Sequence, residues 1–368
     1  MNINDTIGKA LAQAGLDTRA GPMKEVTDTI RKALAQAGLG GEPSSTASDA
    51  NVIDVMARDI TAPLPPQGGG QWVTRTLHHS AGVRDYKLYR PASRAGESQE
   101  TCPLVVMLHG CTQSADDFAA GTRMNQLADE HGFLVLYPEQ STSANASRCW
   151  NWFRPQDQVR DGGEPALLAA MVREVMETQS AGQAVNPQRV FVAGLSAGAA
   201  MAVILGETWP DLFAAVGAHS GLSFAAAHDI PSAMAAMKGR GVMGRAHFPG
   251  TTGDPRRIAT HAVPTIVFHG DRDHTVQHSN GEHITERARN TGQPSRGQSE
   301  TGTASGGRRY TRTVHTDTAG RVLAEQWTLH GAGHAWSGGD ASGSYTDNTG
   351  PDASAEMLRF FLAQPPRG

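Results

Sequence analysis

The sequence predicts an α/β protein built on an open, doubly wound, mostly parallel β-sheet with helices on both faces. From Trp72 onward, short apolar runs rich in Val, Ile and Leu alternate with longer segments whose apolar residues follow helical spacing. The first seventy residues differ in character from the rest and end in a stretch rich in Pro and Gly. We therefore expect a small helical N-terminal extension followed by one large α/β domain.

The expected strands are short and apolar, as in a sheet that is buried on both faces. They cover residues 104–108, 134–137, 190–193, 214–218, 265–269 and 324–329. Residues 164–178 and 198–207 are expected to form intervening helices, and a further helix is expected near residues 356–362. Ligands bind at the carboxyl ends of the strands in such sheets, so the residues that follow each strand are the ones to inspect.

The N-terminal extension contains a near-perfect internal repeat. Residues 5–16 recur as residues 28–39, with Arg31 in place of Gly8. Each copy begins with an Asp suited to cap a helix and has a Gly placed to end it, which predicts two short amphipathic helices. We expect them to mediate docking or self-association, with targeting as the alternative role. A Pro- and Gly-rich linker at residues 63–70 separates domains at 1–71 and 72–368.

Composition and charge exclude several classes of protein. The 36 acidic and 32 basic residues give a formal charge of −4 without a long basic run, so nucleic acid is not an expected partner. Apolar stretches such as residues 103–108 are far shorter than the roughly 20 residues of a membrane-spanning helix. Residues 1–5 lack the basic start of a secretion signal, and no apolar segment of the required kind follows. Three cysteines allow at most one disulfide.

A candidate nucleophile follows the strand expected at residues 190–193. Gly194, Leu195, Ser196, Ala197 and Gly198 form a G-x-S-x-G motif that leads directly into a helix. A nucleophilic serine in this position needs a sharp turn that lifts its hydroxyl above the sheet, and the two glycines remove side chains that would collide there. We expect Ser196 to be the nucleophile, the alternative being a Gly-rich turn with an idle serine.

A serine hydroxyl becomes a strong nucleophile when a histidine accepts its proton and an acid orients that histidine. Asp271 and Asp273 follow the strand at residues 265–269, and we favour Asp273 while Asp271 stays a rival. His330 ends the strand at residues 324–329, whereas His334 lies beyond two glycines in a loop free to reach back over the sheet. We therefore favour His334 as the base.

An oxyanion hole requires two backbone N–H groups that point at the developing negative charge. We assign these donors to Ala197, which follows the nucleophile, and to Cys111, which follows the strand at residues 104–108. For Cys111 the alternative is a small buried apolar residue with a packing role only.

Five motifs in this order resemble the catalytic domain of poly(3-hydroxybutyrate) depolymerases, and are similar also to the related feruloyl and acetylxylan esterases. They are His109-Gly110-Cys111-Thr112-Gln113, Cys149-Trp150-Asn151-Trp152-Phe153, Gly194 to Gly198, His269-Gly270-x-x-Asp273 and Gly333-His334-Ala335-Trp336-Ser337-Gly338-Gly339. The resemblance covers roughly residues 72–363. It implies an α/β-hydrolase fold, a triad of Ser196, His334 and Asp273, and no cofactor or metal.

The resemblance also implies a disulfide between Cys111 and Cys149 and a free thiol at Cys102. It implies a serine carboxylic-ester hydrolase that acts on amorphous poly(3-hydroxybutyrate), its oligomers or short-chain esters. An extracellular location follows from the same family, with a cytoplasmic location as the alternative because no secretion signal is recognised.

Aromatic residues are expected to line the substrate pocket. Trp336, Trp150, Trp152 and His109 would lie near the triad, although core packing is an equal alternative for Trp150 and Trp152. The long segment 222–262 contains Met234, Met237 and Met243, and either caps the pocket as a lid or is a surface excursion.

Three other functions compete with the leading one. Feruloyl or acetylxylan esterase activity differs only in the substrate. A metal-dependent hydrolase is a remote alternative, because His274 and His278 lie at i, i+4 but lack the glutamate of the H-E-x-x-H zinc motif. The third is a binding module that has kept the fold and lost the chemistry.

Overall fold

The computed structural model of the 368-residue chain describes residues 68–92, 101–179, 184–240, 263–290 and 292–366. All of them belong to one compact unit, Val52–Gly368. Most of the predicted 1–71 extension, with its repeat, lies outside the described residues. Residues 241–262 of the predicted 222–262 lid or excursion also lie outside them.

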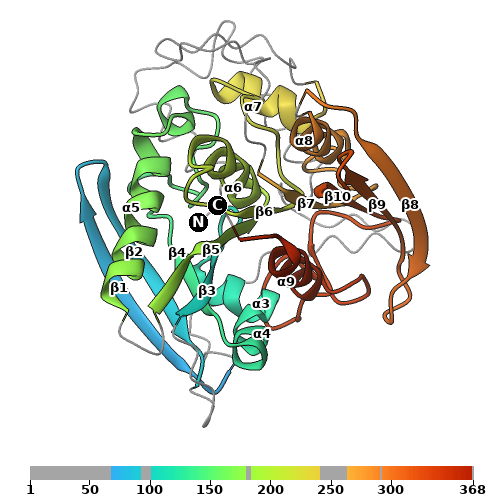
Figure 1. The fold of residues 1–368 in the computed structure, drawn as a ribbon. Helices are drawn as coiled ribbons and strands as arrows, with labels where there is room; N and C mark the ends of the chain where they lie inside the picture. The colour runs from blue at the N-terminus through green and yellow to red at the C-terminus, as the bar shows by residue number, and fades with distance from the viewer. Residues whose placement is uncertain (1–67, 93–100, 180–183, 241–262, 291, 367–368) are drawn as a thin grey trace, which may run out of the picture. The chain divides into compact units, whose positions relative to one another are not determined.

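A ten-stranded sheet runs through the described part of this unit (Figure 1). Its strands lie in the order β1-β2-β4-β3-β5-β6-β7-β10-β9-β8. Their bounds are β1 Gln71–His79, β2 Gly82–Arg90, β3 Thr101–Leu108, β4 Leu134–Pro138, β5 Ala184–Leu195, β6 Ala215–His219, β7 Thr265–Gly270, β8 Arg296–Thr303, β9 Arg309–Thr316 and β10 Val322–Leu329. Two short strands, β11 (Trp336–Ser337) and β12 (Thr346–Asp347), pair separately.

The six central strands, from β4 to β10, are all parallel to their neighbours within this group. They are the six strands that the sequence predicts, so the mostly parallel, doubly wound sheet is confirmed. Antiparallel pairs flank them, with β1 and β2 on one side and β8 and β9 on the other. The prediction missed these outer strands because their partly polar sequences lack the continuous apolar run of a strand buried on both faces.

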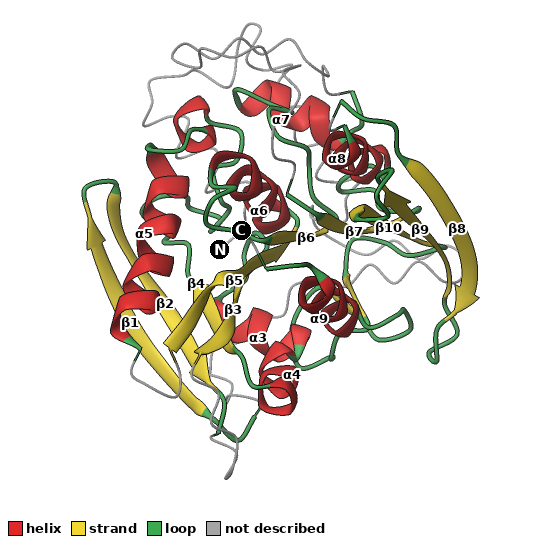
Figure 2. Cartoon of the chain, in the orientation of Figure 1, coloured by secondary structure: helices red, strands yellow, loops and turns green. Residues whose placement is uncertain are grey.

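Helices cover both faces of the sheet (Figure 2). The segments are α3 Ala115–Thr122, α4 Met124–His131, the 3-10 helix η1 Pro155–Gln158, α5 Gly163–Thr178, α6 Ala197–Thr208, α7 Ile230–Met237, α8 Ser279–Arg289 and α9 Ala353–Ala363. The predicted helices at 164–178, 198–207 and 356–362 correspond to α5, α6 and α9. Part of the segment from residue 222 onward forms α7.

The core has two layers, one on each face of the sheet. Alternate residues of β3 point to opposite sides, as the period of a strand requires. Val106 and Leu108 pack in the layer that contains buried residues of α5 and α6. Val105 and Met107 pack in the layer that contains buried residues of α3, α4 and α9. Both faces of β3 are therefore packed in apolar layers.

The parallel order brings several polar segments to one edge of the sheet. Residues that follow β3, β5, β6, β7 and β10 all leave the sheet at its carboxyl edge, because neighbouring parallel strands point the same way. In the described part of the chain, no helix has both the length and the apolar character needed to cross a membrane.

Candidate active site

Ser196 occupies a sharp turn between β5 and α6. Its backbone has φ 58° and ψ −118°, a positive φ that a side chain adopts only where the surrounding structure enforces it. Its N–H donates to the carbonyl oxygen of His219 at 2.9 Å. Ser196 is partly exposed, whereas residues 191–195 and 197–200 are buried. The turn therefore presents a single side chain at the carboxyl edge of the sheet.

The two glycines of the motif make this turn sterically possible. A Cβ at Gly194 would lie 2.5 Å from the carbonyl carbon and oxygen of Gly198. A Cβ at Gly198 would lie 2.1 Å from the carbonyl oxygen of Leu108, at the end of β3. These are backbone atoms, which cannot rotate away as a flexible side chain would. The motif therefore records the close approach of α6 to β3 and β5.

Asp273 and His334 form a hydrogen-bonded pair at the same edge. His334 Nδ1 lies 2.7 Å from Asp273 Oδ2, although the residues are 61 positions apart in the chain. Because a carboxylate only accepts, Nδ1 carries the proton and Nε2 is left as the acceptor. The Asp273 side chain is fully buried, and the His334 side chain is 13% exposed. The pair thus has the tautomer that a general base for a serine requires.

The Asp273 carboxylate is surrounded by donors. Its Oδ1 accepts from the N–H groups of Thr275 and Val276 at 2.9 and 2.8 Å. Its Oδ2 lies 3.4 Å from His269 Nε2 in addition to its bond with His334. Burial by itself would raise the pKa of Asp273, but hydrogen bonds from His269 and His334 and their charges outweigh it and hold the pKa far below its usual range. Asp273 is therefore ionised at neutral pH.

His269 is a buried residue that the sequence analysis quoted only as part of a motif. It is the fifth residue of β7, and its Nε2 donates to the carbonyl oxygen of Val276 at 2.8 Å. This bond closes the loop that carries Asp273. Its position at a strand end, four residues before the acid, is the signal by which it could have been found.

His219, which belongs to none of the five sequence motifs, connects the turn of Ser196 with the loop of His334. Its carbonyl oxygen accepts from Ser196 N, and its ring Nε2 accepts from Ser337 N at 3.0 Å. The ring is stacked between Phe268 and Trp336. Burial, followed by the charges of His269 and His334, lowers the pKa of His219 well below its usual range, so it stays neutral and can accept. No pattern in the sequence distinguishes it from an ordinary core residue.

Ser196 and His334 share this edge without a hydrogen bond between them in the described structure. Ser196 N and the N–H of Ser337, three residues after His334, both donate to His219, which links the two segments along this edge. A hydrogen bond of this kind is often long in a free enzyme and tightens when substrate binds.

The two rivals from the sequence analysis pair with each other. His330 Nδ1 lies 3.0 Å from Asp271 Oδ2, and both side chains are about one third exposed. Asp271 Oδ1 also accepts from the Gly331 N–H at 2.7 Å. The structure therefore separates the four candidates into one buried pair and one exposed pair.

The expected oxyanion donors are the N–H groups of Cys111 and Ala197. Among the loop and turn hydrogen bonds of the described residues, none is donated by the N–H of Cys111 or of Ala197. The loop that follows β3 is held firmly. Gln113 Oε1 accepts from Gly110 N at 2.9 Å, and Thr112 N donates to the Ser147 carbonyl oxygen at 2.7 Å. The disulfide between Cys111 and Cys149 is confirmed, and Cys102 is a buried cysteine outside it.

The four residues expected to contact substrate are all buried. Burial lowers the pKa of His109 to about 4, and its ring accepts from the Gln140 N–H. Trp150 Nε1 donates to the His109 carbonyl oxygen, and Trp152 is only 6% exposed. Trp336 is 1% exposed, because its ring packs against Phe118 and donates to Ser354. The structure thus gives these side chains packing and loop-holding contacts instead.

More exposed groups lie at the loop that follows β3, residues 109–114, which we call the oxyanion loop because it carries the expected donor Cys111. Thr112 is exposed, and its Oγ1 lies 3.3 Å from the hydroxyl of the partly exposed Tyr345. Within the described residues, no group of three or more His, Cys, Asp or Glu side chains is arranged to hold a metal ion, and His274 and His278 belong to no such group.

Comparisons with known proteins give concordant matches. The family model described as esterase PHB depolymerase matches residues 84–306. Poly(3-hydroxyalkanoate) depolymerase C of Paucimonas lemoignei is 31% identical over 240 residues, which cover 63% of this chain and 54% of that protein. Poly(3-hydroxybutyrate) depolymerase of Ralstonia pickettii is 28% identical over 77% of this chain and 59% of that protein. The chain therefore spans somewhat more than half the length of these two relatives.

Other matches are to proteins named as acetylxylan esterases. A probable acetylxylan esterase A of Aspergillus clavatus is 31% identical over 46% of this chain and 51% of that protein. Among solved structures, an acetyl xylan esterase from Aspergillus awamori superposes with a TM-score of 0.58 at 18% identity. This superposition covers 79% of this chain and 99% of that one, and it supports the same fold.

Proposed function

The chain belongs to the esterase PHB depolymerase family of α/β-hydrolase fold, and we propose that it is a serine carboxylic-ester hydrolase. The observation that carries this proposal is the buried Asp273–His334 pair at the same sheet edge as the strained turn of Ser196. Family membership alone would leave open which residues act, and this arrangement supports Ser196, His334 and Asp273.

In the proposed mechanism, Ser196 Oγ attacks the ester carbonyl carbon while His334 Nε2 accepts its proton. Asp273 holds the imidazole and stabilises its charged form. The N–H groups of Cys111 and Ala197 donate to the oxyanion of the tetrahedral intermediate. His334 then gives its proton to the departing alcohol oxygen, which leaves an acyl-enzyme on Ser196. Water, activated by the same histidine, attacks this ester and restores the serine.

We propose amorphous poly(3-hydroxybutyrate), its oligomers and short-chain esters as substrates. Two of the most similar relatives carry the names of depolymerases of such polyesters. An extracellular location is part of the proposal, because a disulfide beside the oxyanion loop persists in an oxidising compartment. Self-association through the N-terminal extension also stays a proposal. Feruloyl or acetylxylan esterase activity is the second candidate, since relatives named for these activities match as well.

The test is hydrolysis of an amorphous poly(3-hydroxybutyrate) suspension beside short p-nitrophenyl esters, with Ser196→Ala as the control. Clearing of the polymer by the wild type alone supports the depolymerase. Turnover of small esters without clearing directs the assignment to oligomers, or to feruloylated or acetylated sugars tested next. Equal turnover by Ser196→Ala would refute the serine mechanism.

A further inference from the structure

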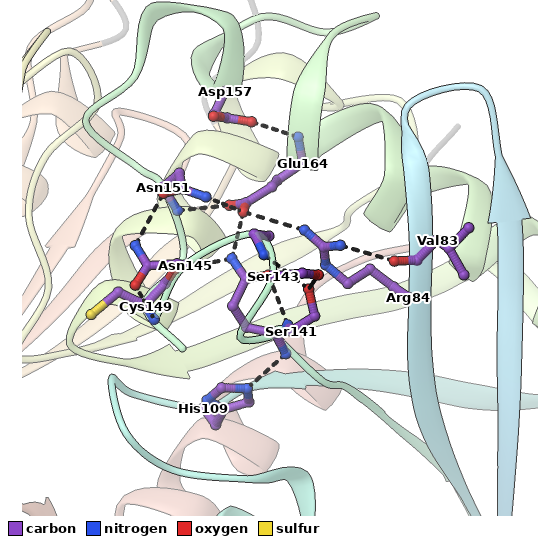
Figure 3. A network of polar contacts seen from close by, with 12 residues as sticks. Val83, Arg84, His109, Ser141, Ser143, Asn145, Cys149, Asn151, Asp157 and Glu164 are labelled. Atoms are coloured by element: carbon purple, nitrogen blue, oxygen red, sulfur yellow. Dashed lines mark hydrogen bonds and ion pairs between the residues drawn. The ribbon is translucent and has the colours of Figure 1, made fainter. Parts of the chain in front are cut away.

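A buried carboxylate behind the oxyanion loop has no part in the mechanism above. Glu164, near the start of α5, is 4% exposed. Its Oε1 accepts from Gln140 Nε2 at 2.5 Å and from Asn151 Nδ2 at 2.7 Å, and its Oε2 accepts from the Asn151 N–H at 2.7 Å. Figure 3 shows these bonds converging on one side chain. Because a buried carboxylate without hydrogen bonds is costly, the three hydrogen bonds to Glu164 indicate that this contact is a specific feature of the fold.

The groups that donate to Glu164 belong to one loop, residues 139–151. Gln140 Nε2 also donates to the Cys149 carbonyl oxygen at 2.9 Å. Asn151 Oδ1 accepts from Asn145 Nδ2 at 3.1 Å, and Asn145 Oδ1 in turn accepts from the Cys149 N–H at 3.4 Å. Glu164 thus joins both ends of the loop to the first turn of α5, and Cys149 is hydrogen-bonded to Gln140 and to Asn145 of the same loop.

Three connections run from this loop to residues 109–111. Gln140 N donates to His109 Nε2 at 3.1 Å, and Trp150 Nε1 donates to the His109 carbonyl oxygen at 3.1 Å. The third is the disulfide from Cys149 to Cys111. A shift of the loop would therefore move the backbone of Cys111 with it.

Two charged groups approach Glu164 from other elements. Asp157 of η1 accepts from the Glu164 N–H at 2.8 Å, and Arg84 Nη2 of β2 lies 3.8 Å from Glu164 Oε1. Asp157 fixes the backbone of Glu164, whereas the arginine is too distant for a hydrogen bond. The hydrogen bonds from Gln140 and Asn151 to Glu164 therefore fix the position of the loop relative to α5.

We propose that Glu164 is a positioning residue, which holds the Cys111 N–H in the oxyanion hole through Gln140, Asn151 and the Cys111–Cys149 disulfide. This inference rests on the proposed esterase function. Loss of one oxyanion donor costs about 10²–10³ in kcat in a serine hydrolase. A displaced donor is expected to cost less than a deleted one, and the cost falls on kcat because the interaction forms in the transition state.

The experiment compares Glu164→Ala and Glu164→Gln with Glu174→Ala and Glu174→Gln. Glu174 lies on the same helix and accepts one hydrogen bond, from Tyr86 at 2.6 Å, outside this loop. We expect Glu164→Ala to lower kcat on p-nitrophenyl butyrate at least ~10-fold with KM within about 3-fold. Glu164→Gln keeps an oxygen acceptor and should lie between Glu164→Ala and the wild type. The Glu174 variants should match the wild type.

A second readout does not depend on catalysis. The rate at which dithiothreitol reduces the Cys111–Cys149 bond, followed by thiol trapping, reports how firmly the loop is held. We expect faster reduction in both Glu164 variants than in the matching Glu174 variants. If Glu164→Ala does not fold, Glu164→Gln decides, because it changes one atom.

Equal kcat and equal reduction rates in the Glu164 and Glu174 variants would overturn the proposal. A loss of kcat that follows only the unfolded fraction would overturn it as well. If the wild type does not hydrolyse esters but reduction is still faster in the Glu164 variants, the proposed function fails while the loop contact stands.

Discussion

Replacing Glu164 with Gln should change how the stability of the protein depends on pH. Burial, followed by the charge of Asp157, raises the pKa of Glu164 from 4.5 to about 7, against the hydrogen bonds from Gln140 and Asn151 that lower it. The unfolded chain releases this proton near pH 4.5, whereas the folded chain keeps it until about pH 7. The folded state therefore binds more protons between these values, and its stability falls as pH rises through this window.

The size of the effect follows from the two pKa values. Their difference corresponds to about 3 kcal/mol of folding free energy, lost between roughly pH 4 and pH 8. Gln cannot ionise, so Glu164→Gln should lack this component. Between roughly pH 4 and pH 8, the free energy of unfolding of Glu164→Gln should therefore fall by about 3 kcal/mol less than that of the wild type.

The assay is denaturant unfolding followed by tryptophan fluorescence at several pH values, for the wild type, Glu164→Gln and Glu174→Gln. Glu174→Gln is the control because it removes a carboxylate from the same helix. If unfolding is irreversible, melting temperatures at one scan rate replace the free energies. If the free energy of unfolding changes with pH equally in Glu164→Gln and in the wild type, the pKa of about 7 for the Glu164 carboxyl group is refuted.

Three further predictions concern the site itself. Asp273→Asn should lower kcat about 10³-fold or more, because His334 loses the carboxylate that fixes its tautomer. Asp271→Asn, in the exposed pair, should keep a kcat near that of the wild type, and similar losses in both variants would contradict the separation of the pairs. Gly198→Ala should lower the melting temperature strongly because its Cβ would lie 2.1 Å from a backbone oxygen, whereas the Cβ of Gly69→Ala would have nothing within 4 Å. Thermal melts of both variants check this, and equal melting temperatures would argue against the clash. Reduction of the Cys111–Cys149 bond in the folded enzyme should lower kcat and change KM less. Both constants are measured before and after dithiothreitol treatment, and full activity after complete reduction would show that the disulfide does not hold the Cys111 N–H in place.

The sequence predicted the centre of the fold better than its edges. The six parallel strands each contain a short apolar run, and β4 and β7 are buried along their whole length, so the pattern of these runs reflects one environment. β8 is almost entirely exposed and its sequence is polar, so only its pairing with β9 makes it a strand. Pairing between distant segments leaves no periodic signal within either one.

The candidate site divides in the same way. The sequence points to Ser196, Asp273 and His334 because each follows a recognisable strand in a fixed order, and their catalytic roles stay a proposal. His219 and Glu164 could not, because their roles depend on partners elsewhere in the fold, such as Ser337 and Gln140. Trp336 was expected at the substrate because it follows the histidine closely, but the short pair of β11 and β12 and the ring of His219 keep it in the core.

The parallel arrangement of the central strands has a consequence for how the site is formed during folding. Parallel neighbours cannot join through a tight hairpin, so each pair closes only after a long crossover has been ordered. The segments that carry Ser196, Asp273 and His334 leave three different strands, and β10 pairs with β7 across the intervening β8 and β9. Compaction and helix formation can thus precede any productive geometry. Recovery of ester turnover during refolding should lag behind the recovery of helical signal.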